Sequence, residues 1–114
     1  MPRRKRDRWH QVANWLRHEF PAPHPVDLRV ENLTLPRKPI EYGEAGKVGR
    51  RFLVRLDPRQ TWLNGLDTLL HEWAHVLSWQ AQLHHGDEWA LAYGRLYRAW
   101  HEEDGWKESK EYGW

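Results

Sequence analysis

Apolar residues recur every three or four positions near the start of the chain, which is the spacing of one face of a helix. This pattern predicts an amphipathic helix over roughly residues 8–19, and its apolar stripe consists of Trp9, Val12, Ala13, Leu16 and Phe20. Trp15 lies off that stripe, so it is the better candidate for an exposed aromatic side chain. Proline occupies positions 21, 23 and 25, which ends the helix and predicts an extended connector.

Alternation of apolar and polar residues then predicts two half-buried strands, over residues 26–30 and 51–56. Between them, a further strand is expected to start at Ile40 and Tyr42. The turn after it is expected at three glycines: Gly43, Gly46 and Gly49. The second and third strands are expected to pair as an antiparallel hairpin within a small three-stranded sheet, antiparallel or mixed.

Two helices are expected after the hairpin. Asp57-Pro58 favours a helix start, with Gln60 completing a capping box and Thr61 as an alternative cap. This helix is expected to run to about residues 80–83, and one of its faces is apolar: Leu66, Leu69, Trp73, Val76 and Leu77. After a break at residues 84–86, a last helix carries an aromatic row: Trp89, Tyr93, Leu96, Tyr97 and Trp100. The order helix, three strands, helix, helix predicts an α+β domain.

Basic and acidic residues are unevenly divided along the chain. Residues 1–59 carry 14 Lys and Arg against 7 Asp and Glu, whereas residues 60–114 carry 4 against 9. A basic run at the start is a candidate contact for nucleic-acid phosphates and comprises Arg3, Arg4, Lys5, Arg6 and Arg8. The alternative is a solvated basic tail. The sequence is therefore divided into a basic arm (1–8), a folded domain (9–106) and a C-terminal tail (107–114).

The composition excludes several kinds of site. The chain has no cysteine, which rules out disulfides, thiolate zinc sites, cysteine-ligated iron–sulfur clusters and cysteine nucleophiles. No stretch approaches the roughly 20 apolar residues that a membrane span needs, and no apolar segment of a secretory signal follows the basic start. We therefore expect a cytoplasmic protein without a membrane partner, in the host cytoplasm if the protein is phage-encoded.

The strongest chemical signal is His71-Glu72-Trp73-Ala74-His75, an H-E-x-x-H motif in the long helix. Histidines four residues apart lie about 40° apart around a helix, so both imidazoles can reach one metal ion. Glu72 lies about 100° from His71 and about 60° from His75, which suits a general base better than a third ligand. The motif therefore predicts one zinc ion per chain with His71 and His75 as ligands. The alternative is a pair of exposed histidines on a helix face.

A catalytic zinc usually has a third protein ligand, which is expected downstream of the motif. His85 lies ten residues after the second histidine and is followed by a glycine that permits a sharp turn. His84 is adjacent and is not excluded by its chemistry, and Glu88 and Glu102 are carboxylate alternatives. The oxyanion of a hydrolysis reaction needs a hydrogen-bond donor, and the candidates are Tyr93, Tyr42 and His84.

The strand at residues 51–56 precedes the motif helix, and a sheet edge beside such a site can pair with an extended substrate. Arg51, Arg55 and Arg59 would make this edge basic, which favours acidic peptides or DNA-bound proteins as substrates. The alternative is ordinary solvent-exposed charge on a strand.

The motif, followed by His85-Gly86-Asp87-Glu88-Trp89, resembles the SprT-like (Spartan-type) family of zinc metallopeptidases, which carry H-E-x-x-H and then H-G-x-x-aromatic. The resemblance covers about residues 26–100. It implies a single zincin-like domain with zinc ligands His71, His75 and His85 and the catalytic base Glu72. It therefore selects His85 over His84. Many family members act on proteins attached to DNA, which implies a protein or peptide substrate and DNA as a partner through the basic arm.

Two departures from the family are visible. Many relatives carry a cysteine zinc ribbon after the catalytic domain, which a chain without cysteine cannot form. The spacing from His75 to His85 is also short compared with eukaryotic members. The leading hypothesis is a zinc-dependent endopeptidase in which Glu72 activates water at the metal. The alternatives are a non-catalytic, zinc-stabilised module that binds nucleic acid, and a narrow regulatory protease that cuts one partner.

Overall fold

The computed structural model describes residues 4–33, 42–80 and 85–112. Its elements are α1 (Lys5–Glu19), β1 (Val26–Val30), β2 (Gly43–Val48), β3 (Arg51–Leu56), α2 (Trp62–Leu77), α3 (Asp87–His101), α4 (Gly105–Glu108) and the 3-10 turn η1 (Ser109–Glu111). The first six follow the predicted order, and the α+β prediction is confirmed. In the described part of the chain, no helix is both long and apolar enough to cross a membrane.

The three strands form one mixed sheet in the order β1-β3-β2, so β3 is central and β2 is an outer strand. β1 pairs with β3 in parallel, with Val26 opposite Phe52 and Leu28 opposite Val54. β2 pairs with β3 antiparallel, which confirms the predicted hairpin. Alternate residues of β1 and β3 are buried, as the sequence pattern predicts.

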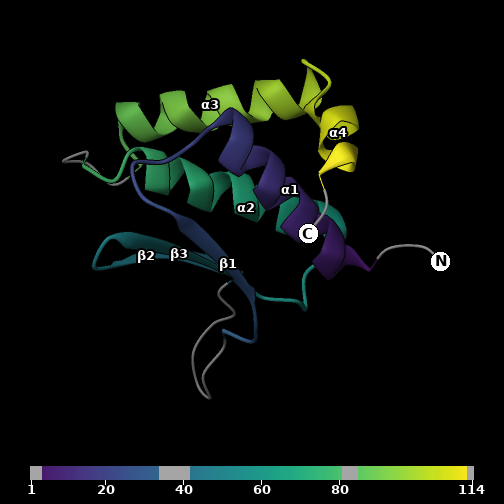
Figure 1. Ribbon diagram of the computed structural model, residues 1–114, viewed down its shortest axis with the longest axis horizontal. Coiled ribbons are helices and arrows are strands. Elements are labelled where there is room, and N and C mark those ends of the chain that lie inside the picture. Colours follow the sequence, from purple (N-terminus) through teal and green to yellow (C-terminus); the bar gives the residue numbers. More distant parts are fainter. Residues whose placement is uncertain (1–3, 34–41, 81–84, 113–114) are drawn as a thin grey trace.

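Helices α1 and α2 lie over one face of the sheet, and α3 lies farther from the strands (Figure 1). α2 contacts β2, β3, α1 and α3, so it is the central helix of the fold. Gly65 lets α1 approach α2 closely, because a Cβ there would lie 2.0 Å from the Trp9 ring. The core between these elements includes Trp9, Leu16, Val54, Leu56, Leu69, Leu70 and Trp73.

Both ends of the fold contain more helix than the sequence predicts. α1 begins at Lys5 rather than near residue 8, and α4 and η1 have no counterpart in the prediction. The prediction that Trp15 is exposed is wrong, since its side chain is only 1% exposed. Its indole packs against Trp100 and donates to the Glu108 carboxylate, because the C-terminal segment covers this side of α1.

Two further boundaries differ from the prediction. β2 occupies Gly43–Val48, where the sequence predicts a turn, because pairing with β3 stabilises this strand despite its two glycines. The turn follows at Gly49, which has φ +58°. α2 is capped by Thr61, whose hydroxyl accepts a backbone N–H, and it ends at Leu77, earlier than the pattern predicts. Ile40 lies outside the described residues.

Candidate metal centre

Three histidine side chains converge beside α2. His71 and His75 lie one helical turn apart on α2, and His85 lies just before α3. Their Nε2 atoms are 3.3 Å apart between His71 and His75, 3.0 Å between His75 and His85, and 3.2 Å between His71 and His85. The ring nitrogens therefore form a nearly equilateral triangle, and we call these three residues the histidine cluster.

The donor atoms of the histidine cluster fit a tetrahedral zinc ion. Zinc–nitrogen bonds of about 2.0–2.1 Å place two nitrogens of a tetrahedron about 3.3 Å apart. The three Nε2 distances, 3.0 to 3.3 Å, lie close to this value. The described residues supply three imidazoles, which would leave one tetrahedral position for water or substrate; three protein ligands are typical of catalytic zinc sites and four of structural ones.

The backbone at His85 adopts an unusual conformation that turns the chain into α3. Its φ of +58° lies in the left-handed region, which residues with a Cβ seldom adopt. The structure thereby brings a histidine, not a carboxylate, to the two helix histidines. Among the described residues, the group of potential ligand atoms within 4.8 Å of one another contains neither Glu88 nor Glu102. His84 lies outside the described residues.

The indole of Trp89 packs against the whole histidine cluster. Its ring centre lies 4.9 Å from that of His71, 5.5 Å from that of His75 and 4.8 Å from that of His85. Its Nε1–H also donates to the carbonyl oxygen of His71 at 3.2 Å. Trp89 therefore joins α3 to α2 directly at the cluster.

Tyr93 lies one turn further along α3 and stacks on Trp89, with ring centres 5.2 Å apart and an interplanar angle of 14°. Its hydroxyl donates to the Asp67 carboxylate on α2. Burial and the neighbouring Asp67 raise the pKa of Tyr93 above its usual value, so the hydroxyl stays protonated at neutral pH. Its ring centre is 6.3 Å from that of His71, but its hydroxyl is already engaged, so Tyr93 could serve as an oxyanion donor only after releasing Asp67.

Glu72 is buried beside β2, with 6% of its surface exposed. Burial raises the pKa of its carboxyl group to about 7. Within the described ranges, no hydrogen bond or ion pair joins Glu72 to another residue, and its oxygens are not enclosed, so water can reach them. The first residue of β2 approaches closely, because a Cβ on Gly43 would lie 3.4 Å from Glu72 Cγ and 2.4 Å from Thr68 Cγ2.

Tyr42, another candidate from the sequence, lies just before β2. The side chain of Tyr42 is 48% exposed, and its carbonyl oxygen accepts hydrogen bonds from the Gln60 side chain and the Asp57 backbone. This carbonyl therefore fixes the loop before α2. Arg3 of the basic run lies outside the described residues.

The expectation of a basic substrate edge at residues 51–56 is wrong. β3 is the central strand, so its backbone already pairs with a neighbour on each side. Acidic side chains also neutralise the three arginines, in the pairs Arg51–Asp27, Arg55–Glu31, Arg55–Glu44 and Arg59–Asp57. The outer strand that contacts α2 is β2.

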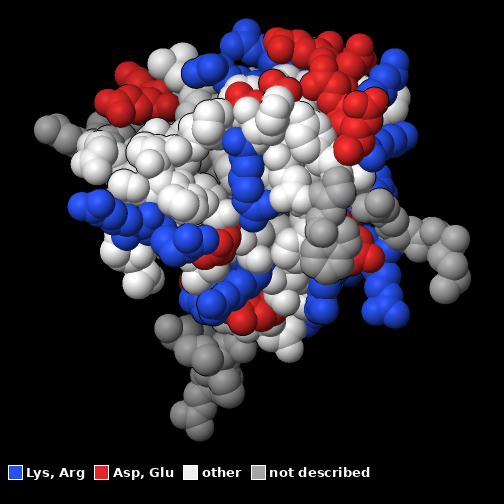
Figure 2. Space-filling view, viewed as in Figure 1, with Lys and Arg blue, Asp and Glu red and all other residues white. Residues whose placement is uncertain are grey.

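The basic run at the N-terminus is partly built into the fold. The Lys5 ammonium donates to the carbonyl oxygen of Gln60 at 2.8 Å, and the Arg8 guanidinium stacks 3.8 Å from the ring centre of Trp62. The other described members of the run are exposed. Acidic side chains gather over both ends of α3 and near α4, while Lys and Arg, with a few acidic side chains among them, are scattered over the rest of this face (Figure 2). The charge on this face is therefore mixed.

Two contributors to the site were not predicted from the sequence: the Asp67–Tyr93 contact and the close approach of Gly43. A glycine inside a strand often marks a close backbone approach, but the sequence pattern assigned this glycine to a turn. Comparison of the chain with protein-family models, curated proteins and solved structures gives no match. The chemistry of the site is therefore argued from its own residues.

Proposed function

We propose that this chain is a zinc-dependent endopeptidase of the zincin type, as in the SprT-like family that its motif resembles. The observation that carries the proposal is the triangle of Nε2 atoms 3.0 to 3.3 Å apart, next to the buried carboxyl group of Glu72. Three nitrogen ligands and one nearby base are the components of a metallopeptidase site.

In this proposal, His71, His75 and His85 hold one zinc ion. A zinc ion with three histidine ligands acts as a Lewis acid and lowers the pKa of a coordinated water to about 7. Trp89 keeps the ligands in place from behind, because its indole contacts all three rings and donates to the His71 backbone. Such outer contacts orient the ligands and tune their affinity.

Glu72 acts as the general base. In the protein without metal, burial raises the pKa of its carboxyl group to about 7. A general base is most effective when its pKa lies near the operating pH. It accepts a proton from the attacking water and then donates it to the leaving amine of the cleaved peptide. Since no side chain in the described segments pairs with this carboxylate, it is available for both steps.

The substrate is an extended polypeptide segment that pairs with β2. The outer edge of β2 has no partner strand among the described residues, and the strand begins beside Thr68 and Glu72. A peptide added to this edge would form backbone hydrogen bonds and pass the base. Loops and unfolded proteins offer such segments. Action on DNA-associated proteins is part of the proposal through the family resemblance.

A purely structural zinc site fits less well, because it normally has four protein ligands. The ligand cluster in the described residues contains three. A buried carboxylate without a partner beside the site also has no use in a structural role, since it costs stability.

The experiment compares Glu72→Gln with the wild type on an unfolded protein substrate, with self-cleavage as a second readout. Glutamine preserves size but cannot accept the proton, so the rate should fall by about 10²–10⁴-fold while zinc content is unchanged. Glu88→Gln is the matched control, because it makes the same change at an exposed acid of α3 and should leave the rate unaltered. Equal cleavage by wild type and Glu72→Gln, both with zinc bound, would refute the proposed mechanism.

A further inference from the structure

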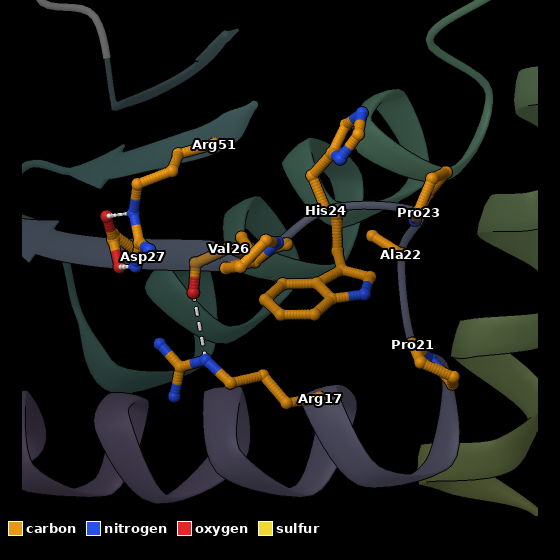
Figure 3. A pocket seen from close by; sticks show the side chains of 10 residues that line it. Arg17, Pro21, Ala22, Pro23, His24, Val26, Asp27 and Arg51 are labelled. Atoms are coloured by element: carbon orange, nitrogen blue, oxygen red, sulfur yellow. Dashed lines mark hydrogen bonds and ion pairs between the residues drawn. The ribbon is translucent and has the colours of Figure 1, made fainter. Parts of the chain in front are cut away.

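A second concave site lies between the end of α1, the connector that follows it and the start of β1. It has a volume of about 470 Å³, within the range of small-molecule sites. Its walls are formed by Arg17, Pro21, Ala22, Pro23, His24, Pro25, Val26, Asp27, Arg51 and Trp73. We call it the Arg17 pocket (Figure 3). Trp73 lies about 200° around α2 from His71, so this pocket is on the opposite side of the helix from the histidine cluster.

Most of the wall of the Arg17 pocket is apolar and rigid. Three prolines have no backbone N–H and a fixed φ, so the connector is held in one extended shape. The Trp73 side chain is anchored, because its Nε1–H donates to the carbonyl oxygen of Phe20 at 3.0 Å. A pre-formed wall of this kind suits a flat apolar group, which would lose little entropy on binding.

Three charged side chains border the pocket, and two of them satisfy each other. Asp27 accepts from Arg51 Nε at 3.0 Å and from Arg51 Nη2 at 2.7 Å. This bidentate pair leaves Arg17 as the cation without an ion-pair partner of its own in segments 4–33, 42–80 and 85–112. The pocket therefore carries one excess positive charge.

Arg17 is held in position by its own hydrogen bonds. Its Nε donates to the carbonyl oxygen of Val26 at 2.9 Å, and its Nη1 donates to the Asn14 side chain. Nη2 has no hydrogen-bond partner in the part of the chain that the structure describes, and the guanidinium lies between α1 and the Asp27–Arg51 pair (Figure 3). Burial lowers the pKa of Arg17, and the charge of Asp27 opposes this shift. The guanidinium remains charged, as arginine does in proteins, but it is only partly solvated.

We propose that the Arg17 pocket binds a carboxylate carried on a flat apolar body. The Nη2 of Arg17 takes the carboxylate, because a charge-assisted hydrogen bond to a fixed guanidinium is strong and specific. The prolines and Ala22 take the apolar part, above the buried Trp73 indole. The carboxylate can belong to a small free acid or to the C-terminal residue of a peptide. The inference goes beyond the proposed peptidase activity and does not depend on it.

In the test, the wild-type protein is titrated with two acids and their neutral amides. Binding is measured by calorimetry and by the change in the NMR chemical shift of the Trp73 indole N–H. Phenylacetate with phenylacetamide represents a small acid, and N-acetylphenylalanine with its amide represents a peptide end. At least one acid should bind about tenfold more tightly than its amide and should shift the Trp73 signal. The acid that shows this preference identifies the source of the carboxylate.

Variants then assign the binding to Arg17. Arg17→Gln should abolish the preference for the acid over its amide. Asp27→Asn should lower the Kd of the acid several-fold, because it removes the negative charge that acts on Arg17 and increases the positive charge of the pocket. This variant decides the question if Arg17→Gln does not fold. Arg98→Gln removes an exposed charge of α3 and should have no effect. Equal binding of acid and amide, or an unchanged Kd in both pocket variants, would overturn the proposal.

Discussion

Gly43 allows β2 to approach the motif helix, and an alanine there should disturb the site without touching a metal ligand. A Cβ at this position would lie 2.4 Å from Thr68 Cγ2, 3.2 Å from the carbonyl oxygen of Arg55 and 3.4 Å from Glu72 Cγ. Thr68 cannot easily rotate away, because its hydroxyl lies 2.8 Å from the carbonyl oxygen of Asn64 and 3.0 Å from Gln60 Oε1. The strand itself must therefore move.

The size of the movement follows from the shortest contact. Carbon atoms pack at about 3.5–4.0 Å, so β2 must withdraw from α2 by about 1 Å. Overpacking of this kind costs about 1–3 kcal/mol of the free energy of unfolding. A 1 Å misplacement of the substrate strand relative to Glu72 should lower kcat/KM by about 100-fold. Zinc content should be unchanged, since the histidine cluster does not contact this glycine.

The assay measures kcat/KM on an unfolded protein, urea-induced unfolding and zinc content. Gly46→Ala is the matched control, because it makes the same change in the same strand where a Cβ would meet nothing within 4 Å. It should keep full activity and gain about 0.5 kcal/mol of stability from the loss of glycine flexibility in the unfolded chain. If Gly43→Ala is as active and as stable as Gly46→Ala, the close packing of β2 on the motif helix is not part of the site.

Three further changes test the surroundings of the site. Trp89→Phe keeps an aromatic ring but removes the N–H that donates to His71, so zinc affinity should fall about 10-fold or more in a chelator competition. Hydrogen bonds from Arg59 hold the pKa of Asp57 well below its usual range, which stabilises the fold above pH 4 or so. Asp57→Asn should therefore lower Tm at pH 7. The difference in Tm between the variant and the wild type should shrink as the pH falls below about 4. The pKa of Glu72 is raised, so its carboxyl group destabilises the zinc-free fold progressively from about pH 4.5 to about pH 7. Glu72→Gln should raise the Tm of the zinc-free protein at pH 8, with up to about 3 kcal/mol of added stability, and should have little effect at pH 4.

Helices α1, α2 and α3 and two of the strands could be predicted from the sequence because their apolar residues recur with the period of a helix or a strand. Buried positions alternate with less buried ones along β1 and β3, and Leu66, Leu69, Trp73 and Val76 of α2 are all buried. Trp15 could not be predicted in this way. Its side of α1 is covered by residues 93 positions away, and no local pattern reports such a contact.

The bounds of β2 were predicted wrongly, because its sequence, with two glycines, has a low strand propensity. It becomes a strand through the backbone hydrogen bonds that β3 offers, so tertiary pairing overrides propensity. The same pairing explains the error about Arg51 and Arg55. Their acidic partners lie on β1, just after β1 and on β2, and only the strand register brings them together. Arg59 pairs instead with Asp57, two residues away in the sequence.

The candidate site, too, could be predicted from the sequence only in part. Helical spacing alone juxtaposes His71 and His75, whereas His85 reaches them through a left-handed backbone conformation that no spacing rule predicts. The family resemblance was needed to choose His85 before the fold was known. The role of Trp89 depends on how α3 packs on α2, which is a property of the folded chain.

The most direct test of the central claim is the zinc content of the purified protein, measured by elemental analysis alongside circular dichroism. The wild type should hold one zinc per chain. His75→Ala should lose most of it, because it removes one of the three converging Nε2 atoms, whereas His101→Ala, at an exposed position of α3, should keep it. A folded His75→Ala protein that retains one zinc per chain would contradict the assignment of the metal to the histidine cluster.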